Sequence, residues 1–269
     1  MSNIPERVNQ ILNEYFDLFE SRLPNVLKAY VIFGSVSLGA FNDGFSDIDF
    51  VAVVNRKFTE ADLGVLKEVH NSIKIQYPKT DLMGMYVMEY DLSFEHENTK
   101  SCPCFIDGIF KGYQRFEKNS IDAYQLKKYG ITIKGQGSEN LKYTVDWDIL
   151  IHNMRDNINT YWFNWENGCK KFPSSKFFCL LLSLGMVEWG VLGVTRLYYT
   201  FKEGDMTSKV GAGEYALKTV PQRWHKIINE SMRLRKGIKK SYYKSIFERR
   251  KDALDYIEYI IKESNNLFN

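Results

Sequence analysis

Short apolar runs alternate with amphipathic stretches in the first half of the chain. Apolar residues recur every three or four positions over residues 5–21, which predicts an amphipathic helix. A second helix is predicted over 59–75, because Thr59 and Asp62 have the spacing of a capping box. Four runs rich in branched and aromatic residues predict buried strands, at residues 29–33, 48–54, 81–88 and 130–134. This pattern predicts a small mixed sheet flanked by helices, with a loop-rich stretch over 89–129.

From about Trp147 the pattern becomes helical throughout. Apolar positions at helical spacing predict five helices, at residues 147–166, 174–201, 208–217, 221–234 and 241–264. The change of character falls in a polar stretch around 135–146. We therefore expect an α/β domain over residues 1–140, followed by an all-α domain over residues 141–269.

The composition is that of an ordinary soluble protein. Apolar residues make up 44% and charged residues 26% of the chain, which argues against disordered, collagen-like and low-complexity classes. The longest apolar stretch, Phe177 to Val194, is broken by Glu188 and by three glycines, so a membrane span is not expected. The polar start is unlike a signal peptide, and the four cysteines fit reduced thiols. We expect a cytoplasmic monomer without a membrane or nucleic-acid partner.

The two parts of the chain differ in charge. Residues 1–100 carry 9 Lys and Arg against 15 Asp and Glu, whereas the rest carries 27 against 18. An acidic first part suits a metal ion and a basic second part suits a polyphosphate, but an unevenly charged solvated surface explains the same numbers. The basic run over 233–240 is expected to be a solvated loop, with phosphate contact as the alternative.

Two aspartates lie at the start of the second predicted strand. Asp47 and Asp49 are two positions apart, so their side chains point to the same face of a strand. Two neighbouring carboxylates repel each other, and a divalent cation that prefers oxygen ligands, such as Mg²⁺, removes this conflict. Gly34 and Ser35 end the preceding strand in a tight turn, where backbone N–H groups and the Ser35 hydroxyl can meet phosphate oxygens. The alternative is a pair of solvated or capping aspartates.

The Gly-Ser turn followed by Asp-Ile-Asp on the next strand resembles the signature of the nucleotidyltransferase superfamily, and the order of predicted helices and strands agrees with it. The resemblance implies that Asp47 and Asp49 hold Mg²⁺, with two ions in all. It implies that Gly34, Ser35 and Ser46 bind the nucleotide. It also implies ATP as the co-substrate.

A second set of residues lies in the helical part. These are Thr195-Arg196-Leu197-Tyr198, Gly204-Asp205-Met206-Thr207-Ser208-Lys209, Ala212 and Glu214-Tyr215-Ala216. They resemble the C-terminal domain of the spectinomycin/streptomycin adenylyltransferases, in which an Arg and a Lys thirteen residues later reach the nucleotide phosphates. Arg196 and Lys209 have this separation, and such cations would offset charge that Mg²⁺ leaves on ATP. The alternatives are a salt bridge within the helical bundle for Arg196 and a solvated lysine for Lys209.

Two positions depart from the family pattern. The family's third carboxylate, a Glu on the third strand that deprotonates the acceptor hydroxyl, is matched by Met83. Asp81 lies two residues earlier, so it is expected on the same face and is the candidate base, with a turn aspartate as the alternative. The acidic residue that binds the cationic drug is matched by Met186. Glu188 is the candidate replacement, with an ion pair to Arg196 or to an N-terminal neighbour as the alternative.

Aromatic residues concentrate in the helical part. Trp189 is a candidate substrate contact because a flat or cationic ligand can stack on its ring, and helix packing is the alternative for it and for Trp162 and Trp165. With the resemblance, these residues predict Mg²⁺-dependent transfer of AMP from ATP to a hydroxyl of an aminoglycoside or aminocyclitol antibiotic, such as spectinomycin or streptomycin. A lincosamide or metabolite acceptor, and a catalytically degenerate nucleotide-sensing module, stay open as alternatives.

Overall fold

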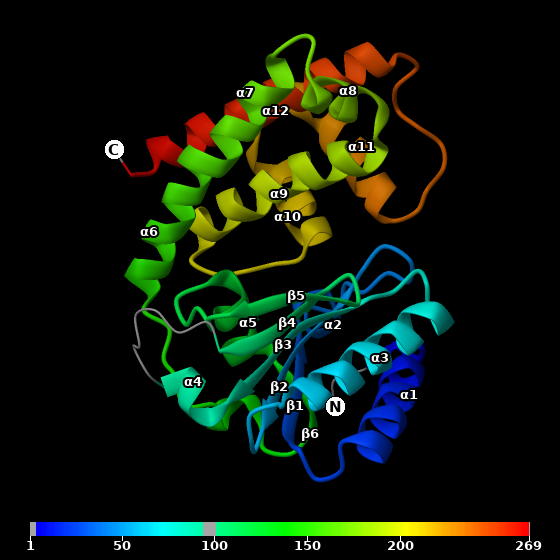
Figure 1. Ribbon diagram of the computed structural model, residues 1–269. Helices are drawn as coiled ribbons and strands as arrows, with labels where there is room; N and C mark the ends of the chain where they lie inside the picture. Colours follow the sequence, from blue (N-terminus) through cyan, green and yellow to red (C-terminus); the bar gives the residue numbers. More distant parts are fainter. Residues whose placement is uncertain (1–3, 94–100, 269) are drawn as a thin grey trace. The chain divides into compact units, whose positions relative to one another are not determined.

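The computed structural model of the chain describes residues 4–93 and 101–268. The chain divides into two compact units, Met1–Asp146 and Trp147–Asn269. The first unit is a mixed sheet flanked by helices and the second is helical (Figure 1). The predicted fold class is therefore confirmed.

The first unit is built on a six-stranded sheet in the order β5-β4-β3-β2-β1-β6. Its strands are β1 (Leu27–Phe33), β2 (Ile48–Val54), β3 (Leu82–Met88), β4 (Cys102–Ile106), β5 (Ile109–Gln114) and β6 (Ile131–Lys134). Strands β2 and β3 run parallel, and the other neighbouring pairs are antiparallel. Parallel neighbours need a crossover connection, and α3 (Glu60–Gln76) provides it.

The two faces of the sheet are covered by different helices. The even-numbered residues of β2, from Ile48 to Val54, pack with α1 (Glu6–Arg22) and α3. The odd-numbered Val51 and Val53 pack on the other face, with residues of α5 (Ile121–Tyr129). Since side chains alternate along a strand, Asp49 belongs to the face of α5.

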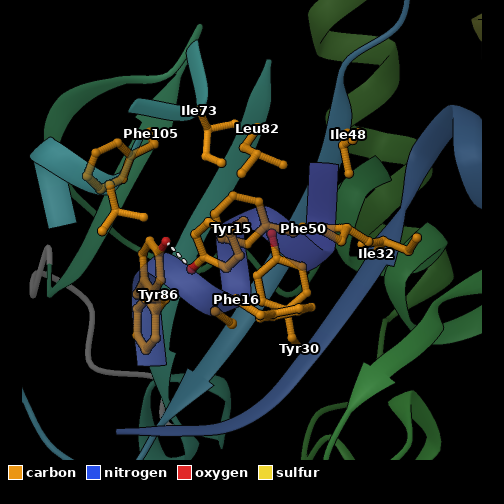
Figure 2. Packing of buried hydrophobic residues seen from close by; sticks show 14 of the residues in the cluster. Tyr15, Phe16, Tyr30, Ile32, Ile48, Phe50, Ile73, Leu82, Tyr86 and Phe105 are labelled. Atoms are coloured by element: carbon orange, nitrogen blue, oxygen red, sulfur yellow. Dashed lines mark hydrogen bonds between the residues drawn. The ribbon is translucent and has the colours of Figure 1, made fainter. Parts of the chain in front are cut away.

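An aromatic cluster fills the core under α1 and α3 (Figure 2). Within it the hydroxyls of Tyr15 and Tyr86 are hydrogen-bonded at 2.7 Å, and His70 Nε2 lies 2.8 Å from the Tyr86 hydroxyl. The His70 ring also stacks on Phe105, with 3.8 Å between the ring centroids. A buried chain of polar groups is stable only when its members bond one another, and these three do.

This burial predicts an acid-sensitive core. Burial lowers the pKa of His70 to about 3, whereas an unfolded histidine titrates near 6.5. Between these values the unfolded chain binds the proton and the folded chain does not, so stability must fall as the pH falls. We expect the free energy of unfolding of the wild type to drop by roughly 2–3 kcal/mol more than that of His70→Phe between pH 6.5 and 4.5.

Urea unfolding of the full chain at both pH values measures this difference. His152→Gln is the matched control, because the His152 side chain is exposed and lies on a surface helix. The control should keep the acid sensitivity of the wild type. If the free energy of unfolding falls equally with pH in the wild type and in His70→Phe, then His70 is protonated in the folded state.

The segment predicted to be loop-rich, residues 89–129, is the main error of the sequence reading. It contains strands β4 and β5 and helix α5, together with the short α4 (Glu89–Ser93). The strands are short, β4 contains a proline, and half of β5 is exposed at the edge of the sheet, so neither has a clear apolar alternation. The third strand also begins at Leu82, one residue later than predicted.

The second unit contains more helical segments than the five predicted. Its α-helices are α6 (Trp147–Asn157), α7 (Phe163–Lys170), α8 (Ser175–Leu182), α9 (Leu184–Glu203), α10 (Lys209–Thr219), α11 (His225–Arg235) and α12 (Ile246–Asn266). A π-helical turn, Ile158–Trp162, joins α6 to α7. The helix predicted over 174–201 is divided at Ser183, whose hydroxyl caps α9 by accepting from the amide of Met186 at 3.3 Å.

Helices α8 and α9 meet at a sharp bend of 96°. Together they have the length and apolar composition of a bent membrane segment, but within the described residues no single helix meets that test.

Candidate active site

Asp49 lies in a row of side chains that crosses three neighbouring strands. In the register of β1, β2 and β3, Asp49 is flanked by Phe33 on one side and by Met83 on the other. Asp47 directly precedes β2 and is exposed, whereas Asp49 is half-buried. Because register partners in a sheet point to the same face, a side chain at position 83 projects beside Asp49. The position that the resemblance matches to the family's third carboxylate is thus occupied by a thioether.

Gly34 leaves room for the Asp49 carboxylate. Its φ of 66° lies in the left-handed region, and a Cβ on this residue would lie 1.9 Å from Asp49 Oδ2. The Ser35 hydroxyl makes a long contact of 3.5 Å to the carbonyl of Asp47, and buried Ser46 accepts a backbone amide bond at 3.1 Å. The structure therefore brings all five predicted residues of the Gly-Ser and Asp-x-Asp motifs into one small region of the first unit.

A pocket of about 280 Å³ opens beside Asp49 on the face of α5. Its walls are largely apolar and include Phe33, Met83, Met85, Cys104, Phe116 and Leu126. Asp49 shares the lining with two further carboxylates, those of Glu117 and Asp122. Glu117 and Asp122 were not predicted as site residues, because they lie in the segment expected to be loop-rich. A pocket of this kind suits a ligand with an apolar body and a polar or cationic edge.

The donor chemistry of Asp47 and Asp49 fits Mg²⁺. Within the described residues, no group of three or more His, Cys, Asp or Glu side chains gathers as a metal site. Mg²⁺ is commonly held by one or two carboxylates and completes its shell with water and substrate phosphates. A pair of aspartates, with a glycine that leaves room for the Asp49 carboxylate, is therefore a suitable set of protein ligands for such a site.

Asp81 lies elsewhere than its predicted place. The residue precedes β3, and its carboxylate forms an ion pair with Lys74 of α3, the helix that packs on the opposite face of the sheet from Met83. Side chains alternate between the two faces only within a strand. Because Asp81 lies before β3, it need not point to the same face as Met83. Its backbone carbonyl accepts from the amide of Ile48 at 2.8 Å, which helps align β3 with β2.

Glu188 and Lys209 meet in the helical unit. Lys209 Nζ lies 3.1 Å from Glu188 Oε1, and Arg235 Nε lies 3.9 Å from the same oxygen. Arg196 is close enough for its positive charge to lower the pKa of Lys209. Glu188, Lys209 and Arg196, which the sequence singled out, therefore lie near one another, and Arg235 lies beside them. The alternative interpretation of Glu188 as an ion-pair residue therefore holds, with Lys209 as its basic partner and Arg235 nearby.

Trp189 is part of a packed aromatic group. Its ring centroid lies 4.6 Å from that of Trp162 and 5.3 Å from that of Trp165, and Tyr161 lies 6.1 Å away. Gly193 lies on α9, and a Cβ on it would come within 2.6 Å of Trp162, so α9 packs tightly against this ring. Trp162 and Trp165 are buried and Trp189 is half-buried, which leaves part of Trp189 accessible to a ligand.

The basic run over 233–240 is not a solvated loop throughout. Arg233 is only 5% exposed, and its guanidinium donates to both carboxylate oxygens of buried Glu230, at 2.7 and 2.5 Å. Arg233 and Arg235 belong to the last turn of α11, where a positive charge is favoured by the helix dipole. The helix predicted over 221–234 already included the first residues of this run.

Two family models match the chain. The nucleotidyltransferase domain matches residues 12–103, and the C-terminal domain of aminoglycoside adenylyltransferases matches residues 187–263. A search of curated protein sequences finds no match. Among solved structures, the chain resembles spectinomycin adenyltransferase AAD(9) from Enterococcus faecialis, which was crystallised with ATP and spectinomycin. The identity is 16%, the match covers 94% of this chain and 99% of that one, and the TM-score is 0.69, so the two proteins share a fold.

The residues singled out from the sequence fall inside the two matched segments. Asp47 and Asp49 lie in the first segment, and Arg196 and Lys209 lie in the second. The chain therefore contains a nucleotidyltransferase domain and the C-terminal domain of aminoglycoside adenylyltransferases, and it resembles these enzymes.

Proposed function

We propose that the enzyme transfers AMP from ATP, with Mg²⁺, to a hydroxyl of an aminoglycoside or aminocyclitol such as spectinomycin or streptomycin. The observation that carries this proposal is the carboxylate pair Asp47 and Asp49, of which Asp49 lies beside Gly34 and lines a pocket large enough for part of a small molecule. The matched C-terminal domain and the shared fold with AAD(9) support the acceptor class.

In this reaction the acceptor oxygen bonds to the α-phosphorus of ATP, and the bond from that phosphorus to pyrophosphate breaks. Pyrophosphate leaves with the electron pair, and the hydroxyl proton passes to a carboxylate. Asp47 and Asp49 are the residues that would hold Mg²⁺, which, when bound, neutralises charge on the phosphates. Asp49, flanked by Phe33 and Met83, is fixed by the sheet, and this rigidity favours in-line geometry.

The remaining residues divide between nucleotide and acceptor. We assign Gly34, Ser35 and Ser46 to the nucleotide, because they shape the loop beside Asp47. We assign Arg196 and Lys209 to its phosphates, because cations of this kind stabilise the charge of a departing pyrophosphate. Glu188 and Trp189 are the candidate acceptor contacts, and an amino group of an acceptor would have to displace Lys209 from Glu188.

The full chain incubated with ATP, Mg²⁺ and one acceptor at a time tests the proposal. The acceptors are spectinomycin, streptomycin and lincomycin, and the readouts are pyrophosphate release and the mass of the acceptor plus one AMP. Product with either of the first two supports the aminoglycoside assignment. Product with lincomycin alone would move the acceptor class to lincosamides.

A nucleotide-sensing module without transfer activity is the second candidate, and Met83 is the observation that favours it. A methionine beside Asp49 cannot accept a proton from the acceptor. ATP binding without product from any acceptor would support this candidate. Gain of transfer to spectinomycin in Met83→Glu would then show that a base at position 83 is what the natural chain lacks.

The base role of Asp81 is tested by two variants that break the same ion pair. If Asp81 accepts the proton, Asp81→Asn should lower kcat by about 10²–10⁴-fold and leave the KM for ATP unchanged. Lys74→Met removes the partner and keeps the carboxylate, so its kcat should stay within a few-fold of the wild type. If both variants lower the Tm to the same degree and leave kcat unchanged, Asp81 is a structural residue that ties β3 to α3.

A further inference from the structure

Three helices of the second unit direct charged side chains at one carboxylate oxygen. Glu188 lies on α9, Lys209 is the first residue of α10, and Arg235 is the last residue of α11. Glu188 Oε1 is 3.1 Å from Lys209 Nζ and 3.9 Å from Arg235 Nε. Lys209 reaches Glu188 Oε2 as well, at 3.4 Å. The resemblance assigned Lys209 to the nucleotide, whereas Arg235 belongs to the basic run over 233–240, which was expected to be a solvated loop with phosphate contact as the alternative.

The group is largely withdrawn from water. The exposed fractions of the Glu188, Lys209 and Arg235 side chains are 12%, 17% and 16%. Charges that are this far buried are costly unless oppositely charged groups surround them. Lys209 also begins a helix, where the peptide dipoles already place partial positive charge. A lysine at this position therefore requires a nearby anion.

One carboxylate does not fully meet that requirement. Burial lowers the pKa of Lys209, the positive charges of Arg196 and Arg235 lower it further, and Glu188 opposes these effects without cancelling them. A ligand with several negative charges would stabilise the ammonium where Glu188 alone does not. The phosphates of a nucleotide are such a ligand, and Arg offers them a planar, bidentate donor.

We propose that Arg235 is a phosphate-binding cation of the nucleotide site beside Lys209, and that Glu188 is the stand-in anion which the phosphates displace. The proposal rests on the proposed function, since it takes the nucleotide as the ligand of Arg196 and Lys209. It changes the role of Glu188 from a contact for a cationic acceptor to a competitor of the phosphates.

The residue next in sequence supplies a matched control. Lys236 follows Arg235 and pairs with Glu214 at 3.5 Å, with side chains that are 44% and 56% exposed. An exposed pair of this kind contributes little to stability and is screened by salt. Removing the charge of Lys236 therefore changes the net charge as much as removing that of Arg235, at an adjacent but solvated position.

Equilibrium binding of Mg-ATP and of inorganic tripolyphosphate to the full chain, at fixed ionic strength, tests the role of Arg235. Arg235→Met should raise the Kd of both ligands about tenfold or more, because a charge-assisted contact is lost. Arg235→Lys should recover part of the affinity, and Lys236→Met should stay within twofold of the wild type. Equal Kd values in Arg235→Met and Lys236→Met would overturn the proposal.

The role of Glu188 has a readout that a purely structural residue would not affect. Glu188→Gln should lower the Tm without ligand, yet bind tripolyphosphate more tightly than the wild type, because the competing carboxylate is gone. Glu214→Gln, its control, should change neither quantity. Weaker binding in Glu188→Gln would show that Glu188 does not compete with the phosphates.

These measurements do not depend on catalysis. If no acceptor is adenylylated but tripolyphosphate binding depends on Arg235, the phosphate site stands and the transfer proposal fails. If transfer to spectinomycin is observed and Arg235→Met leaves ATP binding unchanged, the proposed function stands and the role of Arg235 is excluded.

Discussion

Asp49→Asn and Asp47→Asn are each expected to lower kcat of nucleotidyl transfer by about 10³-fold or more. A metal-bound phosphate site supplies several kcal/mol of charge stabilisation, and each 1.36 kcal/mol corresponds to a factor of ten in rate. The amide has the shape of the carboxylate but carries no charge. Asp49 is held in the centre of the sheet between Phe33 and Met83, so no other side chain of these strands replaces it.

The fold should survive both changes. Asparagine fills the same volume, so the Tm should stay within about 3 °C of the wild type. Asp17→Asn on the exposed side of α1 is the control for a lost negative charge, and it should retain full activity. Normal turnover in Asp49→Asn, measured as pyrophosphate release with the accepted acceptor, would place the metal site elsewhere.

Gly34→Ala is expected to reduce kcat/KM by roughly 10²-fold or more, because an error of about 1 Å in a reacting group can cost that much. The added Cβ would lie 1.9 Å from Asp49 Oδ2 and 2.8 Å from its Cγ. Since the backbone of Asp49 is fixed within β2, the carboxylate must rotate away. Alanine at a φ of 66° also strains the backbone by about 1–2 kcal/mol.

Gly39→Ala separates these two effects. Gly39 has a φ of 64°, almost that of Gly34, and nothing lies within 4 Å of a Cβ placed on it. Both variants should therefore lose similar stability in thermal unfolding, while only Gly34→Ala loses activity. An equal loss of activity in both variants would attribute the effect to the strained turn and not to the Asp49 carboxylate.

The sequence by itself determined the elements whose signal is local. The pattern of β1 and β2 and the capping box of α3 predicted these elements within a few residues. The Gly-Ser turn and the Asp-x-Asp pair also lie close together in the chain, so their shared region follows from one turn and one strand. The change to a helical pattern near Trp147 needed no tertiary information, because a 3.6-residue repeat is a property of each helix.

Tertiary structure decided the features that depend on partners distant in the chain. Strands β4 and β5 gain their conformation from the pairing of β4 with β3 and of β5 with β4, and a broken apolar alternation does not reveal these pairings. Asp81 turns to Lys74 because it precedes the strand whose alternation was assumed for it. Glu188, Lys209 and Arg235 come from three helices, so their meeting at one oxygen is a consequence of helix packing. The sequence thus determined which side chains are candidates for the chemistry, and only the packing of distant segments decided which of them interact electrostatically, because such interactions depend on distance in space and not along the chain.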